Sequence, residues 1–170
     1  IYTLSLHDAL PILAYVKRIE EYKTKVESIK EENMCEVHPE IGVPIMQALP
    51  YTTNDDIAEM FTNLLASASD IRLSGSAHPA FVEYIKQMSP DEAMIVKHLK
   101  GLEFIPYISL RINLDAPNKG FITIAEKVVN LDHELHLIYP ENVKVDISNL
   151  LSLGIIADAV SLHLVDDNIY

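Results

Sequence analysis

The densest group of potential metal ligands in this sequence is His133-Glu134-Leu135-His136. In the zincin helix motif, two histidines four residues apart share one helical face and bind zinc together. His133 and His136 are three residues apart, so on a strand they would point to opposite faces. On a helix they could share a metal, but the sequence offers no third ligand. We therefore interpret them as surface polar residues and predict no metal site.

Other reactive residue types also lack the context that catalysis needs. Asp55, Asp56 and Glu59 could act as paired carboxylates in acid–base chemistry, but a place in the first turn of a helix explains them more simply. Cys35, the single cysteine, has no basic neighbour in sequence that would lower its pKa. His78 precedes Pro79 at a helix start, where a capping or packing role is expected, and His98 and His163 lie in ordinary element patterns. The serines Ser67, Ser69, Ser74 and Ser76 have no Gly-x-Ser-x-Gly context.

Phosphate loops, dinucleotide fingerprints and internal repeats are also missing from the sequence. We predict no catalytic residue, no cofactor-binding residue and no cofactor. The question of enzymatic activity stays open, with the balance toward a protein that is not an enzyme.

Composition limits the classes of partner. The chain has 170 residues, 49% of them hydrophobic and 22% charged, which is typical of a globular protein. Its formal charge of −12 disfavours binding to nucleic acid or to an anionic membrane. The longest uncharged run, 41–54, is too short to cross a membrane and contains two prolines. One thiol and no visible export signal predict a cytoplasmic protein.

The N-terminal half reads as helices. Apolar residues recur every three or four positions between Leu13 and Lys30, which predicts an amphipathic helix with Glu21 and Lys25 as an i,i+4 pair. A second helix is expected over 40–49, and Thr53 is expected to cap a third. The core stripe of that third helix would be Ile57, Phe61, Leu64, Leu65 and Ala68.

Two further helices have clear start signals. Pro79 is suited to the first position of a helix, and Ser89-Pro90-Asp91-Glu92 is a complete capping box. Gly101 is placed to end the helix that follows the box. The sequence therefore predicts a helical domain over 13–101.

The C-terminal half has a different pattern. Residues 108–112 alternate as in a strand, 121–131 is compatible with strand or helix, and 140–153 reads as a helix that Gly154 would close. Val160, Leu162 and Leu164 alternate again. The order of helix, glycine stop and hairpin predicts a winged-helix-like α+β unit over 102–170. In its second helix Lys144 is the only basic residue, which favours a packing module over a DNA reader.

Both ends carry signs of interruption. Residues 2–12 resemble the translation of a common sequencing adapter, so we expect residues 1–12 to be an artefact rather than natural protein. The final residues, Ile169 and Tyr170, would begin a returning strand that the sequence does not complete. The fold class expected is mainly α with a small α+β part, truncated at both ends.

Four segments, Phe61–Ser69, His78–Val82, Gln87–Ala93 and Asn149–Ile156, together resemble the abortive infection alpha (Abi-alpha) family. Members of this family were formerly classed as a domain of unknown function. The resemblance spans Leu13 to Tyr170 and consists mostly of helix caps and core positions. It implies a bacterial or phage-related cytoplasmic protein linked to phage defence, and it carries no catalytic residue that could be transferred.

These observations support one leading hypothesis and two alternatives. The leading one is a non-enzymatic accessory or regulatory component of phage defence that acts through contacts with an unidentified protein partner. The alternatives are a winged-helix regulator that binds nucleic acid, and an enzyme whose site requires a missing N-terminal region.

Overall fold

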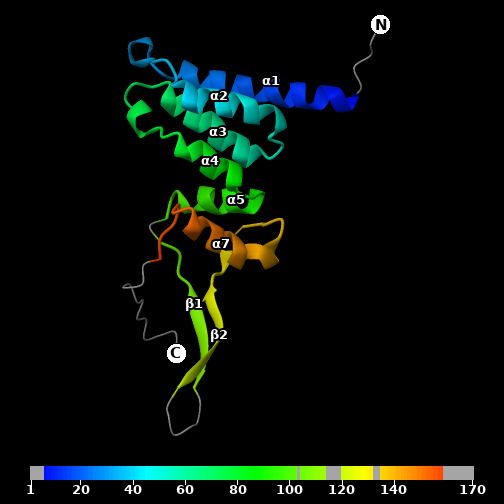
Figure 1. Ribbon diagram of the computed structural model, residues 1–170, viewed down its shortest axis with the longest axis vertical. Coiled ribbons are helices and arrows are strands. Elements are labelled where there is room, and N and C mark those ends of the chain that lie inside the picture. The colour runs from blue at the N-terminus through cyan, green and yellow to red at the C-terminus, as the bar shows by residue number, and fades with distance from the viewer. Residues whose placement is uncertain (1–5, 103, 114–119, 132–134, 159–170) are drawn as a thin grey trace. The chain divides into compact units, whose positions relative to one another are not determined.

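The computed structural model describes residues 6–102, 104–113, 120–131 and 135–158 (Figure 1). The chain divides into two compact units, residues 1–101 and 102–170. The first is helical and the second contains a two-stranded antiparallel sheet and a helix. The described part of the chain is thus mainly α with one small sheet, as the sequence predicts.

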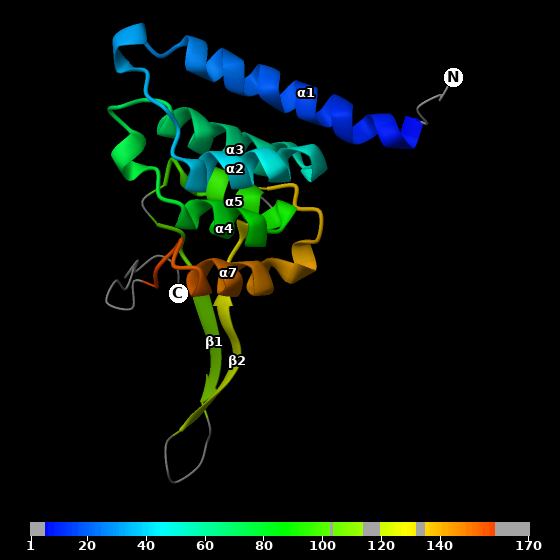
Figure 2. The same ribbon diagram turned by 45° about the horizontal axis from the view of Figure 1, so that its top comes forward.

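Helix α3 is the centre of the first unit, because the other four helices described there each contact it directly. Figure 2 shows α2 and α3 side by side, with α1 running obliquely above them, and α1 contacts α3. Short 3₁₀ turns at 31–33, 49–51 and 74–76 connect them. The helices are α1 (Leu6–Glu27), α2 (Pro39–Ala48), α3 (Asp55–Ala68), α4 (Ala80–Gln87) and α5 (Pro90–Leu99).

The apolar stripe of α3 forms the core of this unit. Phe61 is 2% exposed, and Leu64, Leu65 and Ala68 are also buried, while Ile57 packs against the same cluster. These residues lie on one face because they recur at helical spacing. The predicted core stripe is therefore confirmed. The residues of α2 and α4 that complete the cluster are Ile41, Ile45, Val82 and Ile85.

Local capping signals decide where two of these helices begin. The Ser89 hydroxyl accepts from the Glu92 amide, and the Glu92 carboxylate accepts from the Ser89 amide, so the predicted capping box is confirmed. At α3 the prediction was one residue too early. The cap is Asn54, whose Oδ1 accepts from the Ile57 amide at 3.0 Å, rather than Thr53. Asparagine is among the residues most favoured at this position.

The apolar stripe predicted for α1 is only partly turned inward: Tyr22 of the stripe packs on the core, but its N-terminal members do not. Leu13 is 61% exposed and Val16 is also exposed, whereas Arg18 is only 4% exposed. Tyr15 and Tyr22 supply the ring surface that packs on the core. Glu21 also differs from prediction, because its carboxylate lies 2.9 Å from Arg18 rather than pairing with Lys25. The partners that decide the inward face of α1 are on α3.

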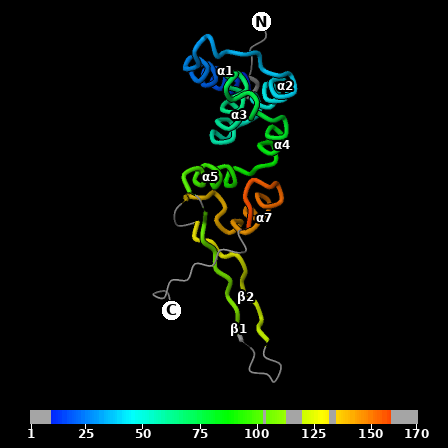
Figure 3. The backbone as a smooth tube through the Cα atoms, turned by 90° about the vertical axis from the view of Figure 1, so that its left-hand side faces the viewer, coloured from blue at the N-terminus to red at the C-terminus, as the bar shows by residue number. Residues whose placement is uncertain are grey.

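The second unit contains strands β1 (Ile108–Asn113) and β2 (Phe121–Val128), which pair antiparallel (Figure 3). Opposite residues include Ile112 with Ile122 and Arg111 with Thr123, and the Arg111 guanidinium lies 4.5 Å from the centre of the Phe121 ring. The ambiguous segment 121–131 is therefore strand as far as Val128.

Helix α7 (Val143–Ser152) follows a 3₁₀ turn at Pro140–Asn142 and buries Val143, Ile147 and Leu150. Gly154 has a φ of +70°, and the Ile155 amide donates to the Leu150 carbonyl at 3.0 Å. This is a Schellman closure, in which glycine adopts the left-handed conformation without a Cβ clash. The predicted helix stop at Gly154 is confirmed.

The winged-helix assignment is not established by these elements. The hairpin β1–β2 comes before α7 in the chain, whereas the hairpin that the sequence predicts would follow that helix. The strand expected at Val160, Leu162 and Leu164 lies outside the described residues. What the structure shows for this unit is a hairpin and a helix.

Phe61 offers a direct test of the core. We expect Phe61→Ala to lower the free energy of unfolding by about 3–5 kcal/mol, because it removes a fully buried ring and leaves a cavity. The measurement is the urea midpoint. Phe81→Ala is the matched control, since Phe81 on α4 is exposed and should lose clearly less. Equal losses for the two variants would contradict the assigned core.

Candidate functional site

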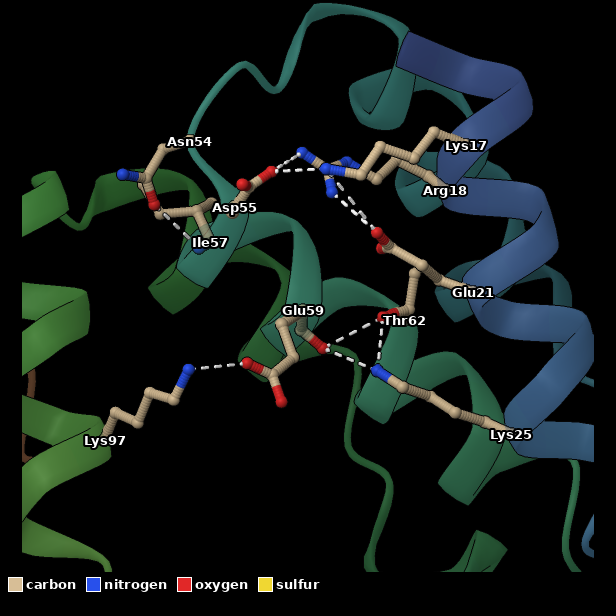
Figure 4. A network of polar contacts seen from close by, with 10 residues as sticks. All are labelled: Lys17, Arg18, Glu21, Lys25, Asn54, Asp55, Ile57, Glu59, Thr62 and Lys97. Carbon is tan, nitrogen blue, oxygen red and sulfur yellow. Dashed lines mark hydrogen bonds and ion pairs between the residues drawn. The ribbon is translucent and has the colours of Figure 1, made fainter.

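A network of charged side chains joins α1, α3 and α5 (Figure 4). Its centre is Arg18, whose two Nη groups donate to Glu21 at 2.9 Å and to Asp55 at 2.5 Å. Lys17 also donates to the Asp55 carboxylate, at 3.0 Å. Asp55 thus receives two cations from α1 at the point where α3 begins.

The electrostatics of this pair follow from its geometry. Hydrogen bonds from Arg18 and Lys17 lower the pKa of Asp55 to about 2, from an ordinary value of 3.8. Burial lowers the pKa of Arg18, but the bonds to Asp55 and Glu21 outweigh burial and raise it overall. The Nε atom of Arg18 is buried with no hydrogen-bond partner in the described part of the chain. Arg18 is therefore held as a permanent cation.

A second set of contacts extends the cluster to α5. Lys97 donates to Asp56 at 2.7 Å and to Glu59 at 2.8 Å, which raises the pKa of Lys97. The hydrogen bond from Lys97 lowers the pKa of Glu59. Through these contacts α3 binds α5 as well as α1. We call the contacts of Asp55, Asp56 and Glu59 with Arg18 and Lys97 the α1–α3–α5 joint.

A hollow of about 300 Å³ lies over this cluster, lined by Lys17, Arg18, Glu21, Lys25, Asp55 and Glu59. A general base needs a pKa near the working pH. The carboxylates of Asp55 and Glu59 have lowered pKa values and are each ion-paired, so neither is suited to take up a proton. We interpret the cluster as a structural joint between helices rather than a catalytic centre.

Sequence reasoning identified Asp55, Asp56 and Glu59 and explained them by the helix dipole. The structure adds the cations that face them, Arg18 and Lys97, which lie 37 to 41 residues away along the chain. No local signal could have shown these pairs. Arg18 is the single arginine of a helix predicted to lie at the surface, and the apolar pattern around it placed it on the exposed face.

The remaining residues that could do chemistry are placed as follows. The Nδ1 atom of His78 accepts from the Ala80 amide at 3.1 Å, just before α4, whose N-cap is Pro79 rather than the predicted first helical position. Cys35 is partly buried and its thiol donates to the Ala68 carbonyl at 3.4 Å. His136 is exposed, and His133 and His163 lie outside the described residues. Among the described residues, no three His, Cys, Asp or Glu side chains are grouped as metal ligands would be.

The β1–β2 hairpin is the most unusual surface of the second unit. Seven of its large apolar side chains are between 42% and 60% exposed. Asp158 accepts from the Tyr107 hydroxyl at 2.9 Å and pairs with Lys127 at 2.7 Å, which ties the chain after α7 to both sides of the hairpin. The exposed side chains are Ile108, Leu110, Ile112, Phe121, Ile122, Ile124 and Val128.

Two strands with this many exposed apolar side chains are typical of a surface that contacts another molecule. Exposed apolar patches beyond a few hundred Å² mark interaction sites in soluble proteins. A two-stranded sheet is also marginally stable alone in water, because neither of its faces forms a core. Of the surfaces in the described residues, this hairpin is the one best suited to bind another protein.

The ion pair between Arg18 and Asp55 predicts a pH dependence of stability. Because folding lowers the pKa of Asp55, the stabilisation is present above about pH 4 and is lost as the pH falls toward 2. We expect the melting temperature of Asp55→Asn to lie below that of the natural chain at pH 6. This difference should close near pH 2.

Glu20→Gln, on the exposed side of α1, is the control and should melt like the natural chain at both values. A difference for Asp55→Asn that stays the same from pH 6 to pH 2 would contradict the assigned role of the carboxylate.

Comparisons with known proteins give one match. No curated protein and no solved structure matches the chain. In the part of the chain that the structure describes, no helix combines the length and the apolar character needed to span a bilayer. The family model described as abortive infection alpha matches residues 14–170, which include both units apart from the first residues of α1. Since this match covers most of the sequence, the chain belongs to the abortive infection alpha family.

Proposed function

We propose that this protein is a non-enzymatic accessory or regulatory component of phage defence by abortive infection, and that it acts through a protein contact made by the β1–β2 hairpin. Membership of the abortive infection alpha family supports the defence setting. The exposed apolar hairpin is the observation that carries the contact. We also propose that the protein is cytoplasmic and that its chain forms two domains, with the boundary at residue 101.

The chemistry of the hairpin favours a protein as the partner. Residues 107–128 contain three basic and two acidic residues, so this segment is close to neutral within a chain of charge −12. A near-neutral apolar surface can approach another protein without strong repulsion. The open edges of β1 and β2 also offer unpaired backbone groups to an added strand.

The alternative of a nucleic-acid regulator has weaker support. Phosphate contacts require lysines and arginines gathered on one face. Helix α7, which a winged-helix-like unit would use for reading DNA, has Lys144 as its one basic residue and buries the acidic Asp146. A winged-helix-like packing of residues 102–170 remains part of our proposal, as a platform for the hairpin rather than as a DNA reader.

Plaque formation by a diverse phage panel tests the defence function. Cells that carry the natural gene should give fewer plaques than cells with an empty vector, with death of the infected cells. Normal plaques on every phage would contradict a role in defence, whatever the hairpin does.

The hairpin contact is tested by Ile122→Thr combined with Ile124→Thr. Threonine is β-branched, so the strand should persist while the apolar surface shrinks. We expect this double variant to lose protection when it is expressed to the same protein level as the unsubstituted chain, with an unchanged melting temperature. Val145→Thr is the matched control, because Val145 is an exposed apolar residue of α7 in the same unit. Full protection by the double variant would contradict the hairpin contact and leave the defence role intact.

A further inference from the structure

A second hollow in the first unit has a different charge balance from the α1–α3–α5 joint. It is an open depression of about 460 Å³ on the surface of the unit. Its walls come from the end of α1, the end of α3, the loop before α4 and the residue after α5. The polar residues that line it include Lys25, Ser28, Ser67, Asp70, Arg72 and Lys100.

The cations of this unit distinguish the hollow from the rest of its surface. Residues 6–101 contain nine lysines and arginines, and seven of them lie within 4.0 Å of a carboxylate. Among these described residues, the two without such a partner are Lys25 and Lys100, and both line this hollow. In a chain of charge −12, two cations that line one hollow and have no carboxylate within 4.0 Å are a specific local feature, although Glu59 and Glu21 act on Lys25 at longer range.

Three cationic side chains line the hollow, Lys25, Arg72 and Lys100, and each could donate hydrogen bonds to a bound anion. The Nζ atom of Lys25 donates to Thr62 at 2.7 Å and to the Glu59 carbonyl at 3.4 Å, and an ammonium group has a third donor. Burial lowers the pKa of Lys25, with Glu59 and Glu21 opposing that effect and Lys97 adding to it. An anion in the hollow would offset this loss of hydration. Lys100 is exposed at the rim.

Arg72 is held rigidly at the opposite wall. Its Nε and one Nη group donate to the Asp70 carboxylate at 2.9 and 2.5 Å, and its amide donates to the same group at 3.0 Å. The Asp70 side chain is buried, so its charge is matched by Arg72. The other Nη group is not used in this pairing. A planar guanidinium oriented in this way is well suited to an oxyanion.

The charges of the hollow therefore sum to about +2, contributed by Lys25 and Lys100, because Asp70 and Arg72 cancel. The hydroxyls of Ser28 and Ser67 add neutral hydrogen-bond donors. A phosphate monoester carries close to two negative charges at neutral pH and several acceptor oxygens. We propose that this hollow binds a small phosphate monoester, with Lys25, Arg72 and Lys100 as the residues that receive its phosphate group.

Isothermal titration of the full chain tests this site. The probes are ribose 5-phosphate and adenosine monophosphate, with unphosphorylated ribose as the matched ligand and ionic strength held constant. We expect saturable 1:1 binding of both phosphorylated compounds, displacement by inorganic phosphate, and no binding of ribose. The absence of saturable binding at millimolar monoester would overturn the proposal.

Variants assign the binding to the hollow. Lys100→Gln should weaken monoester binding about tenfold, because the variant loses one charge-assisted hydrogen bond from an exposed lysine, which lies at the weaker end for such bonds. Folding should be unaffected, since Lys100 is exposed and has no ion pair. Lys86→Gln is the control, because Lys86 pairs with Glu83 on α4 and does not line the hollow. Equal weakening by both variants would overturn the assignment.

A polymeric ligand would give a different result. Duplex DNA at low salt should bind no more tightly than the monoester, because the overall charge of −12 repels a long polyanion more than a small one. Tighter binding of DNA, abolished by Lys100→Gln, would overturn the monoester proposal in favour of a nucleic-acid site.

Discussion

The burial of Arg18 against the start of α3 is the interaction on which the helical unit depends. A guanidinium that is almost fully buried depends on its carboxylate partners, since removing one leaves part of its charge uncompensated. Asp55 and Glu21 fill that role from two directions. This requirement fixes the rotation of α1 about its own axis and exposes Leu13 and Val16. It also places Lys25 over α3, where the lysine borders both hollows of the unit.

The two hollows show how similar residue types can have different consequences. In the joint between α1, α3 and α5, cations and carboxylates alternate, so the charges are used within the fold. In the second hollow, Lys25 and Lys100 have no carboxylate at ion-pair distance. A matched set of charges stabilises packing, whereas an unmatched set is free to attract a ligand. The difference lies in the balance of charge rather than in the number of polar groups.

Sequence reasoning was most successful where a few adjacent residues determine the structure. The Ser89–Glu92 box, the core stripe of α3 and the stop at Gly154 all depend on local geometry, and all three were predictable. The burial of Arg18 on α1 could not be predicted, because it depends on Asp55, which is 37 residues from Arg18 in the sequence. The hollow lined by Lys25 and Lys100 was invisible for the same reason. The cap at Asn54 was missed by one residue, since neighbouring Thr53 has a similar capping preference.

The apolar hairpin has a consequence for the abundance of the protein in the cell. A ribbon with open edges and exposed isoleucines can pair with other chains, which makes it a target for chaperones and proteases. On the proposed function, a molecule whose hairpin is covered by its partner would avoid this fate, whereas a molecule made in excess would not. The steady-state level of the chain would then follow the supply of its partner. The exposed hairpin would thus limit the amount of the protein, with degradation removing molecules that have no partner.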